Sequence, residues 1–278
     1  MKNLTKKVAA VTGAGSGMGR ELAIALAKEG CDVAISDINA DNLQATADLL
    51  KPYNVKVTTT KLDVSDQKAV FAWADEVVAQ HGKVNLVFNN AGVALGSKVE
   101  DLKISDFEWI MGINFWGVVY GTKAFLPHLK QAGEGHIVNV SSLFGLLAQP
   151  MQSAYNASKF AVRGFTESLR QELDMTPCGV SCTCVHPGGI RTNIANNARM
   201  SDTGKAGDNE KAKAHFNKLL HFPADKAAQL MIQAVKDDSP RLLIGTDAHV
   251  MDLIERLTPS HYAKVVAKMT KLAAKFGK

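Results

Sequence analysis

The chain has 278 residues, of which 46% are hydrophobic and 21% charged, so it can form a complete hydrophobic core and lacks the composition of a disordered protein. Its four cysteines are too few for the disulfide framework of a small secreted protein, and no second Cys/His pair lies at metal-ligand spacing, so we expect buried, reduced thiols and no metal site. The net charge of +5 belongs to residues 260–278, which contain five lysines and no acidic residue, whereas basic and acidic side chains are equal in number elsewhere.

Short apolar segments alternate along the chain with segments of helical periodicity. We expect strands over residues 8–11, 32–36, 55–61, 86–89, 136–140, 180–185 and 242–244. We expect helices over about 17–29, 40–51, 67–80, 105–131, 154–174 and 224–237. Most of the strand segments are almost entirely apolar, as in a parallel sheet that helices cover on both faces. The sequence therefore predicts a doubly wound, Rossmann-type α/β fold as a single domain, residues 1–259.

No segment has the pattern of a targeting or membrane-spanning helix. The apolar run at residues 8–11 is too short for the core of a signal peptide, and the longest uncharged stretch, residues 137–158, contains many polar side chains. We therefore expect an intracellular, cytoplasmic protein, with no nucleic-acid partner because its main body carries no excess charge.

Two segments depart from the regular alternation. Residues from about 190 to 222 are rich in Asn, Lys, Asp and Gly, which predicts a mobile substrate flap containing a short helix near residues 210–220. Residues 260–278 place four lysines on one helical face beside Val265, Met269, Leu272 and Phe276. This pattern predicts a basic amphipathic helix, which either attaches peripherally to an anionic membrane or packs on the domain through Val265 and Leu272.

Residues 12–19, Thr-Gly-Ala-Gly-Ser-Gly-Met-Gly, connect the first expected strand to the first helix. Glycines let the backbone approach a pyrophosphate, whose charge the helix N-terminus stabilises. Asp37, which ends the second strand, can accept both ribose hydroxyls and would repel a 2′-phosphate, unless it only caps the next turn. Because Ile38 and Asn39 supply no positive charge, we predict NAD rather than NADP; Arg20 and Lys61 are the basic side chains that could reverse this choice.

With these and three further motifs, the sequence resembles the compact branch of the short-chain dehydrogenase/reductase family over residues 7 to about 245. The further motifs are Asp63-Val64, Asn89-Asn90-Ala91-Gly92 and Pro187-Gly188 with Thr192. The resemblance implies adenine contact at the first, a strand end beside the cofactor at the second, and the nicotinamide carboxamide at the third. It also implies a homodimer or homotetramer formed through the helices at 105–131 and 154–174. The cofactor-binding residues it implies are Gly13, Ser16, Gly17, Met18, Gly19, Asp37, Asp63, Val64, Asn90, Ala91, Gly92, Tyr155, Lys159, Pro187, Gly188, Ile190 and Thr192.

Tyr155 and Lys159 are four residues apart and share one face of the predicted helix. Tyrosine is a poor base at its ordinary pKa of about 10, and we expect the lysine ammonium, with the positive nicotinamide ring, to lower that pKa. Ser142, thirteen residues before Tyr155, is chosen over Ser141 to hydrogen-bond the substrate oxygen. The resemblance gives Asn114 a water-mediated proton relay to Lys159.

The substrate side is expected to be apolar and to lack an arginine clamp, which favours a hydrophobic alcohol or ketone. We therefore predict an NAD-dependent oxidoreductase that interconverts a secondary alcohol and its ketone by hydride transfer, with Tyr155 as general acid/base. The alternatives are an NADPH-dependent carbonyl reductase of oxoacyl type and, in a different class, a non-catalytic dinucleotide-binding redox sensor. The expected substrate residues are Leu95, Ser142, Leu143, Phe144 and Met151.

Overall fold

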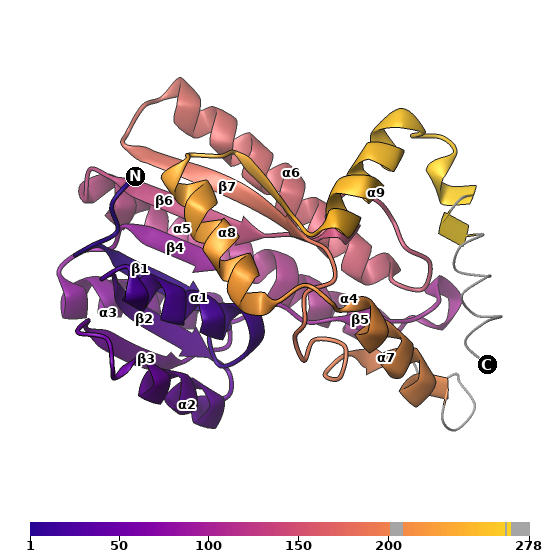
Figure 1. Cartoon of the computed structure of the whole chain (residues 1–278), viewed down its shortest axis with the longest axis horizontal. Helices are drawn as coiled ribbons and strands as arrows, with labels where there is room; N and C mark the ends of the chain where they lie inside the picture. The colour runs from indigo at the N-terminus through magenta and orange to yellow at the C-terminus, as the bar shows by residue number, and fades with distance from the viewer. Residues whose placement is uncertain (201–207, 265, 268–278) are drawn as a thin grey trace.

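The computed structural model describes residues 1–200, 208–264 and 266–267. Seven parallel strands form one sheet in the order β3-β2-β1-β4-β6-β7-β9, with helices on both faces (Figure 1). This arrangement confirms the predicted doubly wound, Rossmann-type fold. The strands are β1 (Val8–Thr12), β2 (Asp32–Asp37), β3 (Val57–Lys61), β4 (Leu86–Asn89), β6 (Gly135–Val140), β7 (Val180–Pro187) and β9 (Arg241–Ile244).

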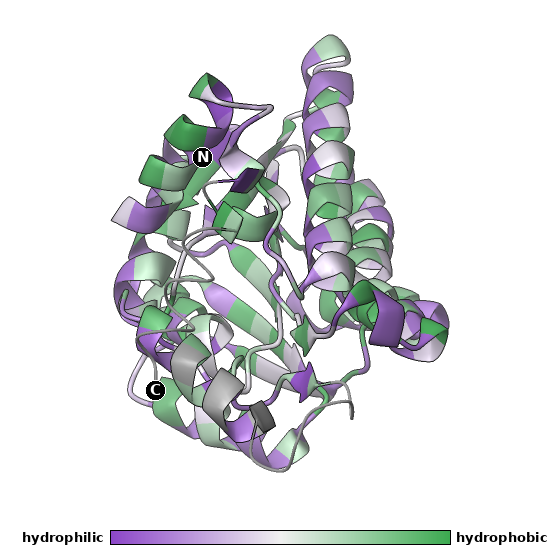
Figure 2. Ribbon diagram, turned by 90° about the vertical axis from the view of Figure 1, so that its right-hand side faces the viewer, coloured by the Kyte–Doolittle hydropathy of each residue, from purple (hydrophilic) through white to green (hydrophobic). Residues whose placement is uncertain are grey.

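The helices form two layers around the sheet. One layer contains α1 packed on α8, and the other contains α3 packed on α5, with α6 against β7. In Figure 2 the hydrophobic strands lie between these layers, whose outer faces carry much of the hydrophilic colour. The helices are α1 (Gly17–Lys28), α2 (Ala40–Leu50), α3 (Gln67–His81), α4 (Ile104–Met111), α5 (Gly117–Gln131), α6 (Ser153–Met175), α7 (Asp208–Leu219), α8 (Ala224–Lys236) and α9 (Thr246–Leu257).

Local sequence signals account for several of these boundaries. The side chain of Asn39 accepts a hydrogen bond from Asn42 N at the start of α2, and Asp66 accepts one from Ala69 N at the start of α3. Helix α3 ends where Gly82 adopts a left-handed conformation with φ of 78°. These caps follow β2 and β3 closely, so each helix begins soon after the carboxyl end of a strand.

The expectation of one helix over residues 105–131 is wrong in detail. That segment forms α4, a π-helical turn at Gly112–Trp116 and then α5. A Cβ on Gly117 would lie 2.9 Å from Val64 Cγ2, so the glycine lets α5 approach the chain after β3. The π-helical turn contains Asn114, and such turns often occur at functional sites.

Several short elements were not predicted. They are the two-residue strands β5 (Leu95–Gly96) and β8 (Arg199–Met200), which pair in parallel, the 3-10 turns at Val99–Asp101 and Leu143–Gly145, and helix α9. The strands and turns are too short to show periodicity. Helix α9 buries Ala248 but exposes Val250, Leu253 and Leu257, so its apolar residues do not mark one buried face.

The structure covers the two irregular segments only in part. Helix α7 confirms the short helix expected near residues 210–220. Residues 201–207 of the predicted flap, and 265 and 268–278 of the predicted C-terminal helix, lie outside the described residues, including Val265 and Leu272. No helix in the described ranges has both the length and the apolar character needed to cross a bilayer.

All four cysteines are free thiols. Cys31, Cys182 and Cys184 are buried as expected, whereas Cys178, in the turn before β7, is only half-buried. The expectation of burial is therefore wrong for Cys178, because a turn at the end of the sheet is not covered by the helical layers.

Candidate active site

The predicted site residues gather at the carboxyl ends of the parallel strands. The strand order reverses direction between β1 and β4, and ligands of doubly wound sheets bind in the crevice at such a switch point. Ten of the predicted cofactor residues lie on the turns after β1, β3 and β4 or in the first turn of α1: Gly13, Ser16, Gly17, Met18, Gly19, Asp63, Val64, Asn90, Ala91 and Gly92.

The turn after β1 forms a glycine-rich cradle. Gly13 and Gly17 adopt φ of 67° and 52°, a region that favours glycine. A Cβ on Gly13 would lie 2.8 Å from Ala91 Cα, and one on Gly19 would collide with the Gly13 carbonyl. The bare backbone therefore leads directly into the N-terminus of α1, which suits a pyrophosphate.

Thr12 joins this cradle to the turn after β4. Its hydroxyl accepts hydrogen bonds from Asn90 N at 3.0 Å and Ala91 N at 3.1 Å, and its carbonyl accepts one from Asn90 Nδ2 at 2.9 Å. Two motifs 78 residues apart in the sequence are thus held as one rigid unit.

Asp37, at the end of β2, braces the glycine turn. Its Oδ2 accepts a hydrogen bond from Gly15 N at 2.9 Å, and its Oδ1 accepts one from Asn39 N at 2.9 Å. Arg20 donates to Thr46 Oγ1 at 3.0 Å and to the Gly15 carbonyl, so its guanidinium is occupied by the same loop. Asp63, by contrast, accepts from the backbone and hydroxyl of Ser65.

The structure brings the four candidate catalytic side chains together, each no more than 8% exposed. Tyr155 and Ser142 share a side-chain hydrogen bond, and Ser142 Oγ also accepts from Phe144 N at 3.1 Å. Lys159 Nζ lies 5.8 Å from the centre of the Tyr155 ring and donates to the Val140 carbonyl at 3.0 Å.

Ser141 is directed elsewhere. Its hydroxyl donates to the Lys159 carbonyl at 2.8 Å, and a Cβ on Gly145 would collide with its Oγ. The choice of Ser142 over Ser141 therefore agrees with the geometry, because the Ser141 hydroxyl is bonded to the Lys159 carbonyl, whereas Ser142 interacts with Tyr155.

Asn114 connects the π-helical turn to two other parts of the site. Its Oδ1 accepts from Val93 N at 2.8 Å, and its Nδ2 donates to the Val93 carbonyl at 3.0 Å and to Ser158 Oγ at 3.1 Å. A Cβ on Gly92 would lie 3.3 Å from Asn114 Oδ1 and 3.4 Å from Lys159 Nζ. Gly92, Asn114 and Lys159 therefore converge, and the proton relay stays a prediction.

Burial controls the charge states of this group. It raises the pKa of the Tyr155 hydroxyl, which the hydrogen bond from Ser142 partly offsets, and it lowers the pKa of Lys159 to about 8. The lowering of the Tyr155 pKa that we expect from Lys159 together with the nicotinamide ring stays a prediction. Desolvation opposes the phenolate, and Lys159 directs its amino group to the Val140 carbonyl.

The segment after β7 contacts the glycine turn. Pro187 ends β7, Gly188 N donates to the Ile244 carbonyl at 2.9 Å, and a Cβ on Gly17 would lie 3.0 Å from Thr192 Cγ2. Ile190 is buried and bridges to Phe222. The segment predicted to hold the nicotinamide thus reaches from the sheet to the cradle.

The predicted substrate residues fall into two apolar clusters. Leu95 packs with Tyr155, whereas Leu143 packs with Ala248 of α9 and Val266. Phe144 belongs to both clusters, and Met151, 53% exposed with φ of 66°, lies at the surface. The sequence did not identify the other side chains of these clusters, which include Trp109, Ile194, Ala198, Met251, Tyr262 and Val266.

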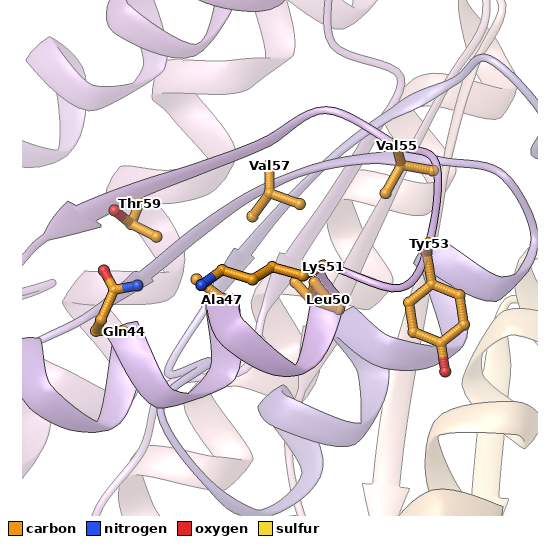
Figure 3. Close-up of a pocket in the computed structure, with 8 residues that line it drawn as sticks. All are labelled: Gln44, Ala47, Leu50, Lys51, Tyr53, Val55, Val57 and Thr59. Carbon is orange, nitrogen blue, oxygen red and sulfur yellow. The ribbon is translucent and has the colours of Figure 1, made fainter.

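A separate hollow of about 360 Å³ lies between α2 and the edge strand β3 (Figure 3). It contains none of the residues of the candidate site, and we assign it no role. Its lining residues are Gln44, Ala47, Leu50, Lys51, Tyr53, Val55, Val57 and Thr59.

Comparison with known proteins identifies relatives of this arrangement. The family model described as short chain dehydrogenase matches residues 7–203. SadH of Mycobacterium tuberculosis, named as an oxidoreductase, is 46% identical over 270 residues, 96% of each chain. A short-chain dehydrogenase/reductase from Burkholderia phymatum in complex with NAD has a TM-score of 0.87 at 30% identity, covering 93% of this chain and 95% of that one. An alcohol dehydrogenase from Thermococcus sibiricus complexed with 5-hydroxy-NADP has a TM-score of 0.73 at 27% identity, covering 86% and 95%.

Proposed function

Since the chain belongs to the short-chain dehydrogenase/reductase family, we propose that it is an NAD-dependent oxidoreductase that interconverts a hydrophobic secondary alcohol and its ketone. The observation that carries the proposal is the buried set of Ser142, Tyr155, Lys159 and Asn114 beside a glycine cradle. A non-catalytic redox sensor would need the cradle but not these four side chains together.

The choice of NAD rests on Asp37. The similar structures include one with NAD and one with an NADP derivative, so family membership does not decide. The Asp37 carboxylate lies against the glycine cradle, where a 2′-phosphate would meet negative charge, and Arg20 already donates to Gly15 and Thr46. The NADPH-dependent carbonyl reductase is the alternative that this carboxylate disfavours.

The reaction needs a proton transfer matched to a hydride transfer. In oxidation, the alcohol C–H bond breaks with both electrons, which leave as hydride, and the hydroxyl proton passes to the Tyr155 oxygen. A dinucleotide whose pyrophosphate lay in the cradle would supply the nicotinamide that takes up the hydride. Ser142 holds the substrate oxygen through its hydroxyl, while Lys159 and Asn114 carry the proton onward and keep Tyr155 able to accept it. Reduction reverses each transfer.

The walls around Tyr155 support an apolar substrate. Leu95, Ala94, Ile110 and Phe144 cluster with Tyr155, and the nearby guanidinium of Arg199 is already paired with Asp106. A carboxylate or phosphate on the substrate would therefore meet no available arginine in this cluster. A small hydrophobic alcohol or ketone fits this surface best.

We also infer a homodimer or homotetramer formed through α5 and α6. Trp116, directly before α5, is 47% exposed, and Phe160 of α6 is 39% exposed. Large aromatic side chains at a surface are typical of protein interfaces.

The proposal is tested by turnover of a panel of apolar secondary alcohols and ketones, each with NAD(H) and NADP(H), followed by nicotinamide absorbance. We expect activity with NAD(H), reduced about 100-fold or more by Tyr155→Phe, since general acid/base catalysis contributes on that scale. Activity with NADP(H) alone would show the alternative reductase to be correct. Tight NADH binding without turnover of any panel member would support the sensor.

A further inference from the structure

The first turn of helix α9 places a carboxylate against the loop that follows β7. Asp247 is the second residue of α9, and its Oδ2 accepts a hydrogen bond from Gly189 N at 2.7 Å. This bond joins positions 58 residues apart. The Asp247 carboxylate thus ties the first turn of α9 to the loop.

The loop is built to receive this carboxylate. A Cβ on Gly188 or on Gly245 would collide with Asp247 Oδ1, and one on Gly189 would lie 3.5 Å from Asp247 Oδ2. Gly245 has φ of 97°, a region that side chains rarely adopt. Three glycines thus enclose one carboxylate, whose Oδ1 is buried and has no hydrogen-bond partner among the described residues.

The opposite edge of the loop is held by the chain after α7. The Gly189 carbonyl accepts from His221 N and Phe222 N, each at 2.9 Å, and Arg191 N donates to the Phe222 carbonyl at 2.8 Å. Beyond this point Thr192 contacts Gly17 of the glycine cradle. The Gly188–Gly189 backbone is therefore fixed between Asp247 on one side and residues 221–222 on the other.

We propose that Asp247 is a positioning residue for the cofactor, acting through the hydrogen bond to Gly189 that holds the loop at 187–192. The inference rests on the proposed function, in which this loop contacts the nicotinamide half of the dinucleotide. Without the Asp247 carboxylate, Gly189 N would be left without its acceptor, and the two consecutive glycines, Gly188 and Gly189, would become free to move when the cofactor binds.

The test compares Asp247→Ala with Asp247→Asn, which keeps an oxygen acceptor for Gly189 N. Asp225→Ala is the matched control, because Asp225 also lies in the first turn of a helix, α8, and is exposed. Two quantities are measured: the NADH dissociation constant by fluorescence, and hydrogen exchange of peptides covering 187–192 in the protein without cofactor. Thermal unfolding checks that each variant is folded.

We expect Asp247→Ala to weaken NADH binding about tenfold, the cost of one hydrogen bond to a charged acceptor, and to speed exchange at 187–192. Asp247→Asn and Asp225→Ala should stay within about threefold of the unsubstituted protein. Unchanged binding in Asp247→Ala, or an equal loss in Asp247→Asn, would overturn the inference. If the unsubstituted protein did not bind NADH at all, the proposed function would fail first, and the exchange data would still show whether Asp247 holds the loop.

Discussion

The ring of Phe144 meets the ring of Tyr155 edge to face, with centroids 6.3 Å apart and planes at 84°. Phe144 and Tyr262 both pack against an apolar cluster that contains Leu143 and the buried Val266. The Tyr262 hydroxyl accepts a hydrogen bond from Ala148 N at 3.4 Å. The segment after α9 therefore packs on the loop that follows Ser142, in the same apolar cluster as Phe144.

This contact predicts that Tyr262 influences substrate size. Tyr262→Ala removes a ring from the apolar cluster on which Phe144 packs, so we expect the preference to move toward bulkier ketones. We expect the ratio of kcat/KM for a bulky ketone to that for a small one to rise about tenfold, the scale that small changes in an apolar pocket produce. Tyr53→Ala, in the separate hollow of Figure 3, is the control. An unchanged ratio in Tyr262→Ala would show that the segment after α9 does not shape the pocket.

The contacts of Arg199 predict an effect on substrate binding. Its guanidinium lies 3.6 Å from the centre of the Trp109 ring and 3.1 Å from Asp106 Oδ1, both on α4, and β8 pairs with β5 beside it. The first part of the predicted flap is thus attached to α4. We expect Arg199→Ala to raise the KM for substrate about fivefold while the NADH dissociation constant stays unchanged, because a cation–π contact with an ion pair contributes about 1 kcal/mol at an exposed site.

Two further variants separate the stacking from the charge. Arg199→Lys keeps the positive charge but loses the planar stacking on Trp109, so its KM should lie between that of the unsubstituted protein and that of Arg199→Ala. Lys98→Ala removes an exposed cation that pairs with Glu100 close to β5, and should have no effect. If Lys98→Ala raised the KM as much as Arg199→Ala, surface charge in general and not this contact would be responsible.

The burial of Lys159 implies that this residue lowers the stability of the fold although catalysis requires it. Burial lowers its pKa to about 8 from the ordinary 10.5, so between these values the unfolded chain binds more protons at this site than the folded protein. Its contribution to the free energy of unfolding is therefore most unfavourable below pH 8 and improves as the pH rises toward 10.5. Lys159→Met should be inactive but more stable than the unsubstituted protein at pH 7, and the difference should shrink by pH 10.

Urea unfolding at pH 7 and at pH 10 measures both free energies. Lys123→Met, at an exposed position of α5, controls for the loss of one positive charge. A stability difference that is the same at both pH values would mean that the Lys159 ammonium is not desolvated in the folded protein.

The features that could be predicted from the sequence are those whose geometry is determined by the spacing of residues along the chain. Tyr155 and Lys159 share a helical face, and the glycine turn follows a strand and opens a helix, so both could be placed without knowledge of the tertiary fold. The missed residues act across the fold. Asp247 meets Gly189, Arg199 meets Asp106 and Tyr262 meets Ala148 over 58, 93 and 114 residues of sequence.

The burial of Tyr155 and Lys159 was missed for the same reason. The four-residue spacing indicated a nearby ammonium, but not the burial of both groups or the Val140 carbonyl that binds Lys159. Desolvation depends on every element packed around a side chain, and a single sequence does not show that packing.

Asp37 gives the sharpest test of cofactor choice, because its charge and its hydrogen bond can be separated. Asp37→Asn keeps an oxygen that can accept from Gly15 N but removes the negative charge, whereas Asp37→Ala removes both. If the charge excludes a 2′-phosphate, Asp37→Asn should raise the NADP-to-NAD ratio of kcat/KM at least about tenfold and leave the cradle intact. Asp37→Ala should show the same shift together with weaker binding of both dinucleotides, because Gly15 N loses its acceptor.

The control for this pair is Asp41→Asn, an exposed carboxylate in the first turn of α2 that follows the same loop. It changes the local charge equally without touching the cradle, so its cofactor ratio should stay within about twofold of the unsubstituted protein. If Asp37→Asn left the ratio unchanged while Asp37→Ala weakened both cofactors, Asp37 would be a brace for the glycine turn only. The preference for NAD would then have to arise elsewhere, with Arg20 and Lys61 as the nearest charges to substitute next.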